Sequence, residues 1–148
     1  MELHRQELST LLKISASLWV IWGLVHAIAG ILTLSGDTAS AIAGIADAVD
    51  PATLLIEYPD AVGAIVNQHG FNLLWGGIVT VIGGLFIWRR NVTAIFVSAL
   101  VGGLFDLGYF IFVDPGGYNK FLPWVGMPII STISIVFSFY VYCQNRFS

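Results

Sequence analysis

The sequence NVTAIFVSALVGGLFDLGYFIFVD, residues 91–114, decides the fold class of this chain. It is an apolar run with one acidic side chain, Asp106, in its interior. At ~1.5 Å per residue, a helix over residues 92–113 is ~33 Å long, which matches the ~30 Å hydrocarbon core of a bilayer. The stretch therefore predicts a membrane-spanning helix that carries a carboxyl group inside the membrane.

The rest of the sequence has the same character. Only 10% of its 148 residues are charged, against about a quarter in soluble domains, and 57% are hydrophobic. Apolar windows of about twenty residues predict four membrane spans in one domain, residues 1–148. The expected fold is all-α, an antiparallel bundle of four transmembrane helices with spans at about 14–34, 71–88, 92–113 and 121–142.

The basic residues predict the orientation in the membrane. Five of the six lie before the first span, between spans two and three, or after span four, and only Lys120 lies on the other side. Because Lys and Arg concentrate in cytoplasmic loops, we expect a multi-pass protein of the cell membrane with both termini in the cytoplasm. No basic patch suggests nucleic acid as a partner.

The long connection between spans one and two has a helical rather than a loop-like composition. Ile42, Ile45 and Val49 recur at helical spacing, and Asp50 before Pro51 is a typical helix start. We expect an extracytoplasmic helical cap over about residues 38–66, with a second short helix at 51–58. A short interfacial helix is expected before Lys13, ahead of span one.

Small and polar residues mark the faces that should point into the bundle. Glycine pairs seven residues apart in span two predict close helix approach, and they also leave a homo-oligomer possible. Ser131, Ser134 and Ser138 define an inward face on span four. In span one, residues three or four apart form one aromatic and polar face: Trp19, Trp22, Gly23, His26, Gly30 and Thr33.

Asp106 and His26 are the centre of the candidate site. A carboxylate in the membrane costs ~2.5 to 3.5 kcal/mol on insertion scales, so it is expected to be paired, neutral or in a wet cavity. Counted from the outer ends of their spans, His26 and Asp106 both lie ~12 Å below the outer boundary and can meet. The candidate ligand-binding residues are His26, Asp106, Asn72, Tyr109, Trp22, His69 and Trp75.

Several functions remain open at this level. The first is a transporter, sensor or binding protein for a small ligand or a proton, and the second is a non-catalytic subunit of a larger membrane complex, in which His26 and Asp106 only join two helices. Haem or quinone binding is a third, although His26 and His69 differ in depth by ~9 Å in upright helices. No metal site is expected, and no combination of nucleophile, base and acid supports catalysis.

Overall fold

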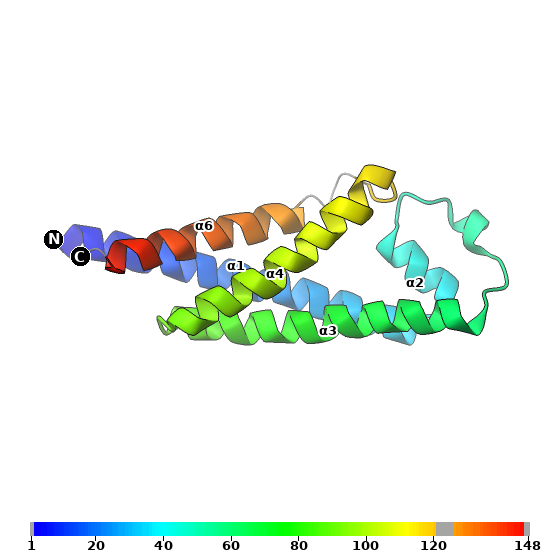
Figure 1. The fold of residues 1–148 in the computed structure, drawn as a ribbon, viewed down its shortest axis with the longest axis horizontal. Coiled ribbons are helices and arrows are strands. Elements are labelled where there is room, and N and C mark those ends of the chain that lie inside the picture. The colour runs from blue at the N-terminus through cyan, green and yellow to red at the C-terminus, as the bar shows by residue number, and fades with distance from the viewer. Residues whose placement is uncertain (1, 121–125, 147–148) are drawn as a thin grey trace.

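The computed structural model describes residues 2–120 and 126–146, and within these ranges all regular structure is helical, without a strand (Figure 1). Four helices are long and apolar enough to cross a membrane, as the sequence predicted. The elements are α1 (Glu2–Ser35), α2 (Thr38–Ile45), η1 (Pro51–Leu54), α3 (Asp60–Trp88), α4 (Val92–Phe112), η2 (Asp114–Gly116) and α6 (Gly126–Arg146).

Two helices extend beyond the predicted spans for the same reason. The helix predicted before Lys13 is continuous with span one in α1, and α3 begins at Asp60, ahead of the predicted start of span two near residue 71. Polar residues such as Asn67 and Gln68 suggested a boundary, but no proline interrupts either helix, and ordinary polar residues cost a helix little. The first five residues of the predicted fourth span, 121–125, lie outside the described residues.

The connection between α1 and α3 is less helical than its composition suggested. Asp37 caps α2, because its carboxylate accepts a hydrogen bond from the Ser40 amide at 2.8 Å. The helix ends at Ile45, and the second helix is only the 3₁₀ turn η1, capped by Asp50. Pro59 then precedes α3. The helical segment expected over about residues 38–66 therefore consists of α2, η1 in place of a helix over 51–58, and the first turns of α3.

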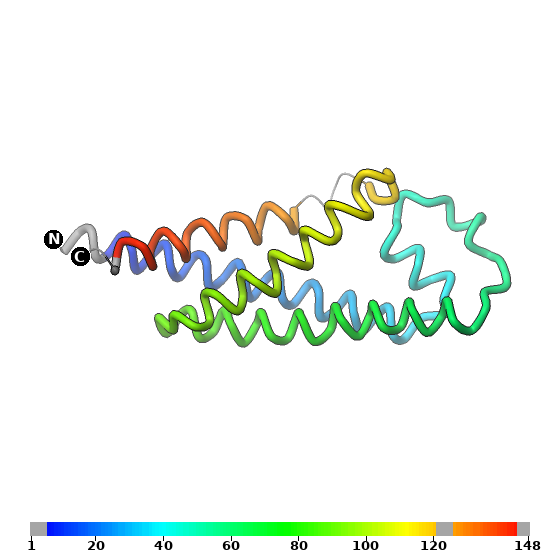
Figure 2. Tube along the Cα trace, viewed as in Figure 1, coloured from blue at the N-terminus to red at the C-terminus, as the bar shows by residue number. Residues whose placement is uncertain are grey.

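Helices α1 and α3 lie side by side along most of their length (Figure 2). Small residues recur every seven positions on both: Ala16, Gly23 and Gly30 on α1, and Gly70, Gly77 and Gly84 on α3. A Cβ atom added to Gly77 would lie 2.5 Å from the Ala27 nitrogen, and one on Gly30 would lie 2.6 Å from the Gly70 oxygen. The backbones are thus in direct contact, so these predicted glycine faces are used within the chain.

Helix α4 contacts α3 near their connecting turn and then diverges from it (Figure 1). The ring of Phe105 fills the space that a Cβ on Gly76 would need, and it meets Trp75 edge to face with the ring centroids 5.8 Å apart. We call the part of the bundle from this contact toward the chain termini the terminal half, and the part toward α2 the cavity half. The two halves differ because α4 diverges from α3 after Phe105, on the side toward α2.

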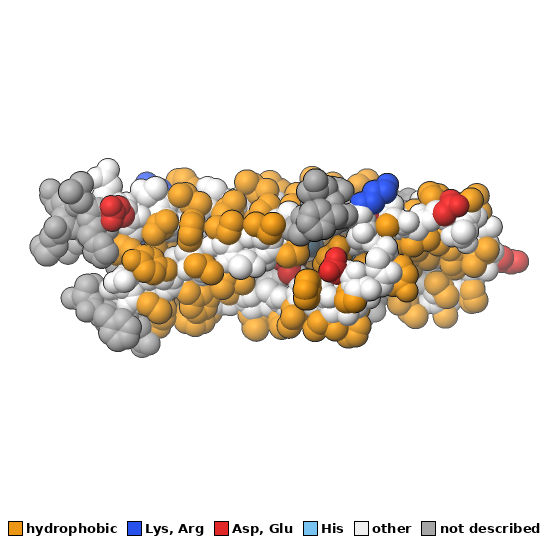
Figure 3. Space-filling model, turned by 90° about the horizontal axis from the view of Figure 1, so that it is seen from above, with side chains coloured by type: hydrophobic (Ala, Val, Ile, Leu, Met, Phe, Trp, Pro, Cys, Tyr) orange, Lys and Arg blue, Asp and Glu red, His pale blue; other side chains and the backbone are white. Residues whose placement is uncertain are grey.

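Helix α6 packs against α1 through the predicted serine face. Ser131, Ser134 and Ser138 are all buried. Ser15 on α1 donates a hydrogen bond to the backbone oxygen of Ser134 at 2.8 Å, which joins the two helices directly. The outside of the bundle is apolar, with exposed hydrophobic side chains on every long helix (Figure 3). This distribution is expected for helices in contact with lipid.

Candidate functional site

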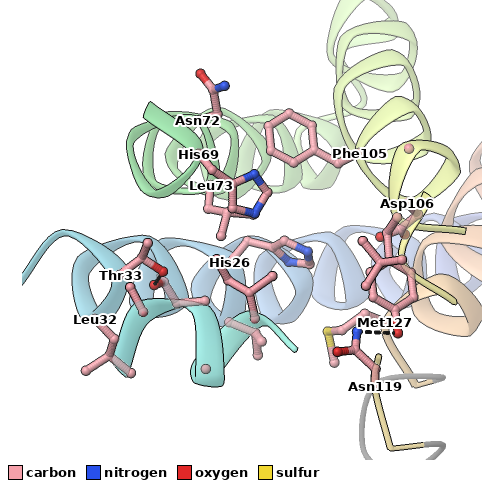
Figure 4. Close-up of a pocket in the computed structure, with 18 of the residues that line it drawn as sticks. His26, Leu32, Thr33, His69, Asn72, Leu73, Phe105, Asp106, Asn119 and Met127 are labelled. Carbon is pink, nitrogen blue, oxygen red and sulfur yellow. Dashed lines mark hydrogen bonds between the residues drawn. The ribbon is translucent and has the colours of Figure 1, made fainter. Parts of the chain in front are cut away.

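A cavity of about 970 Å³ lies in the cavity half, where α4 has separated from α3 (Figure 4). Its wall is mostly apolar, with residues from α1, α2, α3, α4 and α6 and from the loop that follows α4. A few polar side chains converge on it, including His26, His69, Asp106 and Asn119. A largely apolar cavity of this size with a small number of polar groups is typical of small-molecule sites.

Asp106 lines the cavity and is 8% exposed. Its carboxyl group accepts from the indole nitrogen of Trp22, at 3.0 Å to one oxygen and 3.3 Å to the other. The hydroxyl of Ser131 is a second hydrogen-bonding neighbour, but it also donates to the Pro128 carbonyl at 3.1 Å. One N–H and one shared hydroxyl leave most of the acceptor capacity of a carboxylate unused.

The tautomer of His26 follows from its contacts. Its Nδ1 lies 2.8 Å from the backbone oxygen of Trp22, an atom that can only accept. Nδ1 therefore carries the proton, and in the neutral ring Nε2 is left as an acceptor. The imidazole stacks on the Trp22 indole, with the ring centroids 3.6 Å apart and the planes at 18°. His26 thus presents a fixed ring with one available lone pair.

Trp22 is the residue that joins His26 to Asp106. The sequence suggested that the imidazole and the carboxyl group could meet directly, but no hydrogen bond links them. Instead Trp22, which is fully buried, binds Asp106 through its N–H and holds His26 through its carbonyl and its ring. Trp22 can contact both groups because its indole lies one helical turn before His26 on the same face of α1.

The other candidate residues from α3 also lie at the cavity wall. His69, Asn72 and Trp75 line it, and the Trp75 indole donates to the Asn72 side-chain oxygen at 3.1 Å. Because Gly70 packs against Thr33, His69 is level with a position seven residues beyond His26, or ~10 Å higher. Both histidine side chains face the same cavity (Figure 4).

Tyr109 lines the cavity next to Asn119, a residue that the sequence did not single out. In the amide orientation that satisfies both groups, the Asn119 oxygen accepts from the Tyr109 hydroxyl at 2.7 Å and its nitrogen donates to the Ile45 carbonyl at 2.6 Å. Asn119 therefore connects α4 to the end of α2 (Figure 4). In the sequence, an asparagine after two glycines is typical of a turn, and no pattern indicated this second role.

Two further hydrogen bonds hold the α2 segment over the cavity. The Ala48 amide donates to the Tyr118 oxygen at 2.9 Å, and the Lys120 amide donates to the Asp47 carboxylate at 2.8 Å. With Asn119, these contacts fasten the connection between α1 and α3 to the loop after α4. We call this set of contacts the α2 clasp. It closes one side of the space that the divergence of α4 creates.

The described residues contain no group of three His, Cys, Asp or Glu side chains placed to hold a metal ion. The His26 and His69 imidazoles line the cavity, and the Nδ1–H of His26 binds a backbone carbonyl, as is common in histidines whose Nε2 ligates a metal. Comparison with known proteins adds no relationship: no family model, curated protein or solved structure matches the chain.

Proposed function

We propose that this chain is a membrane protein that binds a small amphipathic molecule in the cavity built on Asp106, His26 and Trp22. The observation that carries the proposal is the cavity itself: about 970 Å³ of mostly apolar space into which a buried carboxyl group is directed. Inserting Asp106 in a membrane costs ~2.5 to 3.5 kcal/mol, whereas an interhelical hydrogen bond returns ~0.6 kcal/mol on average. The stabilisation from one interhelical hydrogen bond is therefore smaller than the cost of inserting Asp106, which favours a binding role over a purely structural one.

In the membrane, we place the four long helices as an antiparallel bundle in one domain, with both termini in the cytoplasm and α2 as an external cap. The support is the position of the basic residues, since Arg89 and Arg90 lie in the turn between α3 and α4. The cavity then lies in the outer leaflet, beneath the α2 clasp.

The guest reaches this cavity from the lipid, between α3 and α4. Two of the apolar residues that line it are also exposed on the outside of the bundle: Leu104 is 58% exposed and Phe112 is 77% exposed. Both lie on α4 beside the region where it diverges from α3. A molecule dissolved in the outer leaflet would therefore meet an apolar opening before it meets Asp106.

The test fills the cavity without disturbing the helix contacts. Gly108 lines the cavity, and a Cβ added to it would meet no atom within 4 Å, so Gly108→Phe places a ring in open space. The control is Leu107→Phe, on the lipid-facing side of the same helix. Each variant and the wild type are purified in mild detergent, and bound small molecules are extracted and identified by mass spectrometry.

The proposal expects one class of small molecule at near-stoichiometric amounts with the wild type and with Leu107→Phe, and its depletion from Gly108→Phe. Equal recovery from all three proteins would reject the cavity as the binding site. A stoichiometric second polypeptide in place of a small molecule would favour the accessory-subunit function instead.

Haem or quinone binding is a second candidate, favoured by the tautomer of His26. Its bare Nε2 can accept a hydrogen bond from a hydroquinone or bind haem iron. The same purified protein distinguishes these guests, because bound haem gives a Soret absorbance band and a quinone gives a redox-dependent ultraviolet spectrum. Loss of either signal in His26→Ala, with the fold retained, would support this candidate.

A further inference from the structure

The described residues that line the cavity include one carboxyl group, that of Asp106, and no lysine or arginine. The other titratable groups at its wall are His26 on α1, His69 on α3 and Tyr109 on α4, while α2 and α6 contribute none. A carboxyl group in this setting has to be neutralised by a proton or by a cation from outside the chain.

The polar groups around Asp106 are mainly hydrogen-bond acceptors. From the described residues, the carboxyl group receives the Trp22 N–H and shares the Ser131 hydroxyl with the Pro128 carbonyl. The Nε2 of His26 is a bare lone pair, and the Tyr109 hydroxyl directs its proton to Asn119. A guest that satisfies this set must bring several donors of its own, which an alcohol or a ketone cannot do but an ammonium group with three N–H donors can.

Aromatic rings next to the carboxyl group suit the same guest. Phe105 meets the Trp22 ring edge to face with centroids 6.1 Å apart and meets the Trp75 ring in the same way at 5.8 Å. Trp75, Phe105 and Tyr109 all line the cavity. Aromatic faces attract cations, most strongly where water is excluded, and the apolar remainder of the wall suits a hydrocarbon body.

From these observations we infer that the guest is a lipophilic amine, whose ammonium group binds at Asp106 and whose hydrocarbon part fills the apolar space beneath α2. In the empty protein a proton neutralises the carboxyl group. When the amine arrives as its ammonium cation, it forms an ion pair with the carboxylate and one proton is released. This inference rests on the proposed function, because it names the class of molecule that the proposed cavity takes.

The test uses a matched pair of probes, 1-adamantylamine and 1-adamantanol, which share a shape and differ only in the charged group. The full chain in nanodiscs of neutral lipid is titrated with each probe, empty nanodiscs serve as the blank, and heat and proton release are recorded in weak buffer. We expect the amine to bind at least about tenfold more tightly than the alcohol and to release about one proton per site.

Three variants identify the site. Asp106→Asn keeps an oxygen that accepts from Trp22, so it should fold, lose about tenfold or more of the amine affinity and lose the proton release. Asp106→Glu retains the charge and should retain proton release. Asp114→Asn removes an exposed carboxylate in η2, just beyond the end of α4, and should bind like the wild type.

The outcomes separate this inference from the proposed function. Equal affinity for amine and alcohol, with both unaffected by Asp106→Asn, would overturn the amine as the guest while leaving a cavity that binds amphiphiles. Binding of the amine without proton release would overturn the exchange at Asp106. If neither probe binds, and Gly108→Phe also leaves the extracted molecules unchanged, both the amine and the cavity function are rejected.

Discussion

The two halves of the bundle differ in what fills the space between their helices. In the terminal half, α1 and α3 touch backbone to backbone through Gly23, Gly77 and Gly84, and the Trp19 ring occupies the space beside Gly102 on α4. In the cavity half, α1 and α3 remain in contact at Gly30 and Gly70, but α4 has moved away and about 970 Å³ is left open. Helices α1 and α3 therefore pack closely with α4 in the terminal half and form part of the cavity wall in the cavity half.

This difference shows how a short chain can hold a cavity in a membrane. Lipid tails are as apolar as the helices, so helix association depends on close packing and hydrogen bonds rather than on burial from water. The terminal half supplies that packing, which allows the cavity half to be held open by fewer contacts. The following predictions test the contacts that hold each half together, from the largest expected effect to the smallest.

The largest effect is expected from Gly77→Leu. A Cβ there would lie 2.5 Å from both the Ala27 nitrogen and the Gly23 oxygen, which are backbone atoms that cannot move aside. We expect a loss of about 3 kcal/mol or more in unfolding free energy, measured by thermal or denaturant unfolding in detergent. Gly108→Leu, in the open cavity, should change it by less than about 1 kcal/mol. Equal losses would remove the distinction between the two halves.

A smaller loss is expected from Trp22→Phe, which tests whether the cavity half relies on this indole. The change keeps a ring that can stack on His26 but removes the N–H that binds Asp106 at 3.0 Å. Leaving a buried acceptor without its hydrogen-bond donor costs about 1 to 3 kcal/mol. The control is Trp88→Phe, since Trp88 is 52% exposed and its ring lies 5.7 Å from the Lys13 ammonium. Equal losses of unfolding free energy in the two variants would mean that the hydrogen bond from Trp22 to Asp106 does not stabilise the fold.

Two serine-to-alanine variants in the terminal half should affect the unfolding free energy differently. Ser15→Ala removes the 2.8 Å hydrogen bond between α1 and α6 and should cost about 0.6 to 1.7 kcal/mol. Ser98 is fully buried, and its hydroxyl has no partner within the described part of the chain, so Ser98→Ala should stabilise the protein or leave it unchanged. Unfolding free energies of the two variants test this. A clear loss in Ser98→Ala would mean that its hydroxyl binds a group or a water in the membrane.

The smallest effect is expected at the cap of α2. Hydrogen bonds from the Ser40 amide and hydroxyl hold the pKa of Asp37 below its ordinary value. Because the folded pKa is lowered, the carboxylate stabilises α2 above the pKa of the unfolded chain, and this contribution is lost as the pH falls through the folded pKa. The Ser40 amide resonance should therefore shift with a midpoint below about pH 4, and Asp37→Asn should abolish the shift. A midpoint above that value would contradict the cap.

The sequence predicts the long helices well because a membrane span depends on length and apolar composition, and residues 92–113 meet both requirements. It also predicts the closely packed faces, because glycines seven residues apart lie on one side of any helix. The extension of α3 back to Asp60 was missed because polar residues there were interpreted as the end of a span, although the helix depends on the absence of breakers between Pro59 and Trp88.

The sequence predicts which residues of the site share a helix face, but not which residues on different helices are in contact. His26 and Trp22 lie one turn apart, so their proximity follows from the sequence, but the hydrogen bond between Trp22 and Asp106 depends on how α1 and α4 are rotated about their axes. Asn119 was missed because its partners, Tyr109 and Ile45, come from separate elements. Such contacts arise from the packing of helices, and a single sequence contains no periodic signal for them.

The α2 clasp has a consequence for how the chain could be divided. Residues 51–59, between the clasp and α3, contain η1 and Pro59 and include side chains as exposed as Leu55, at 79%. A cut there would leave α1 and α2 on one fragment, joined to the other through Asp47, Ala48 and the glycine contacts with α3. The two pieces, expressed separately, are therefore expected to reassemble through these contacts.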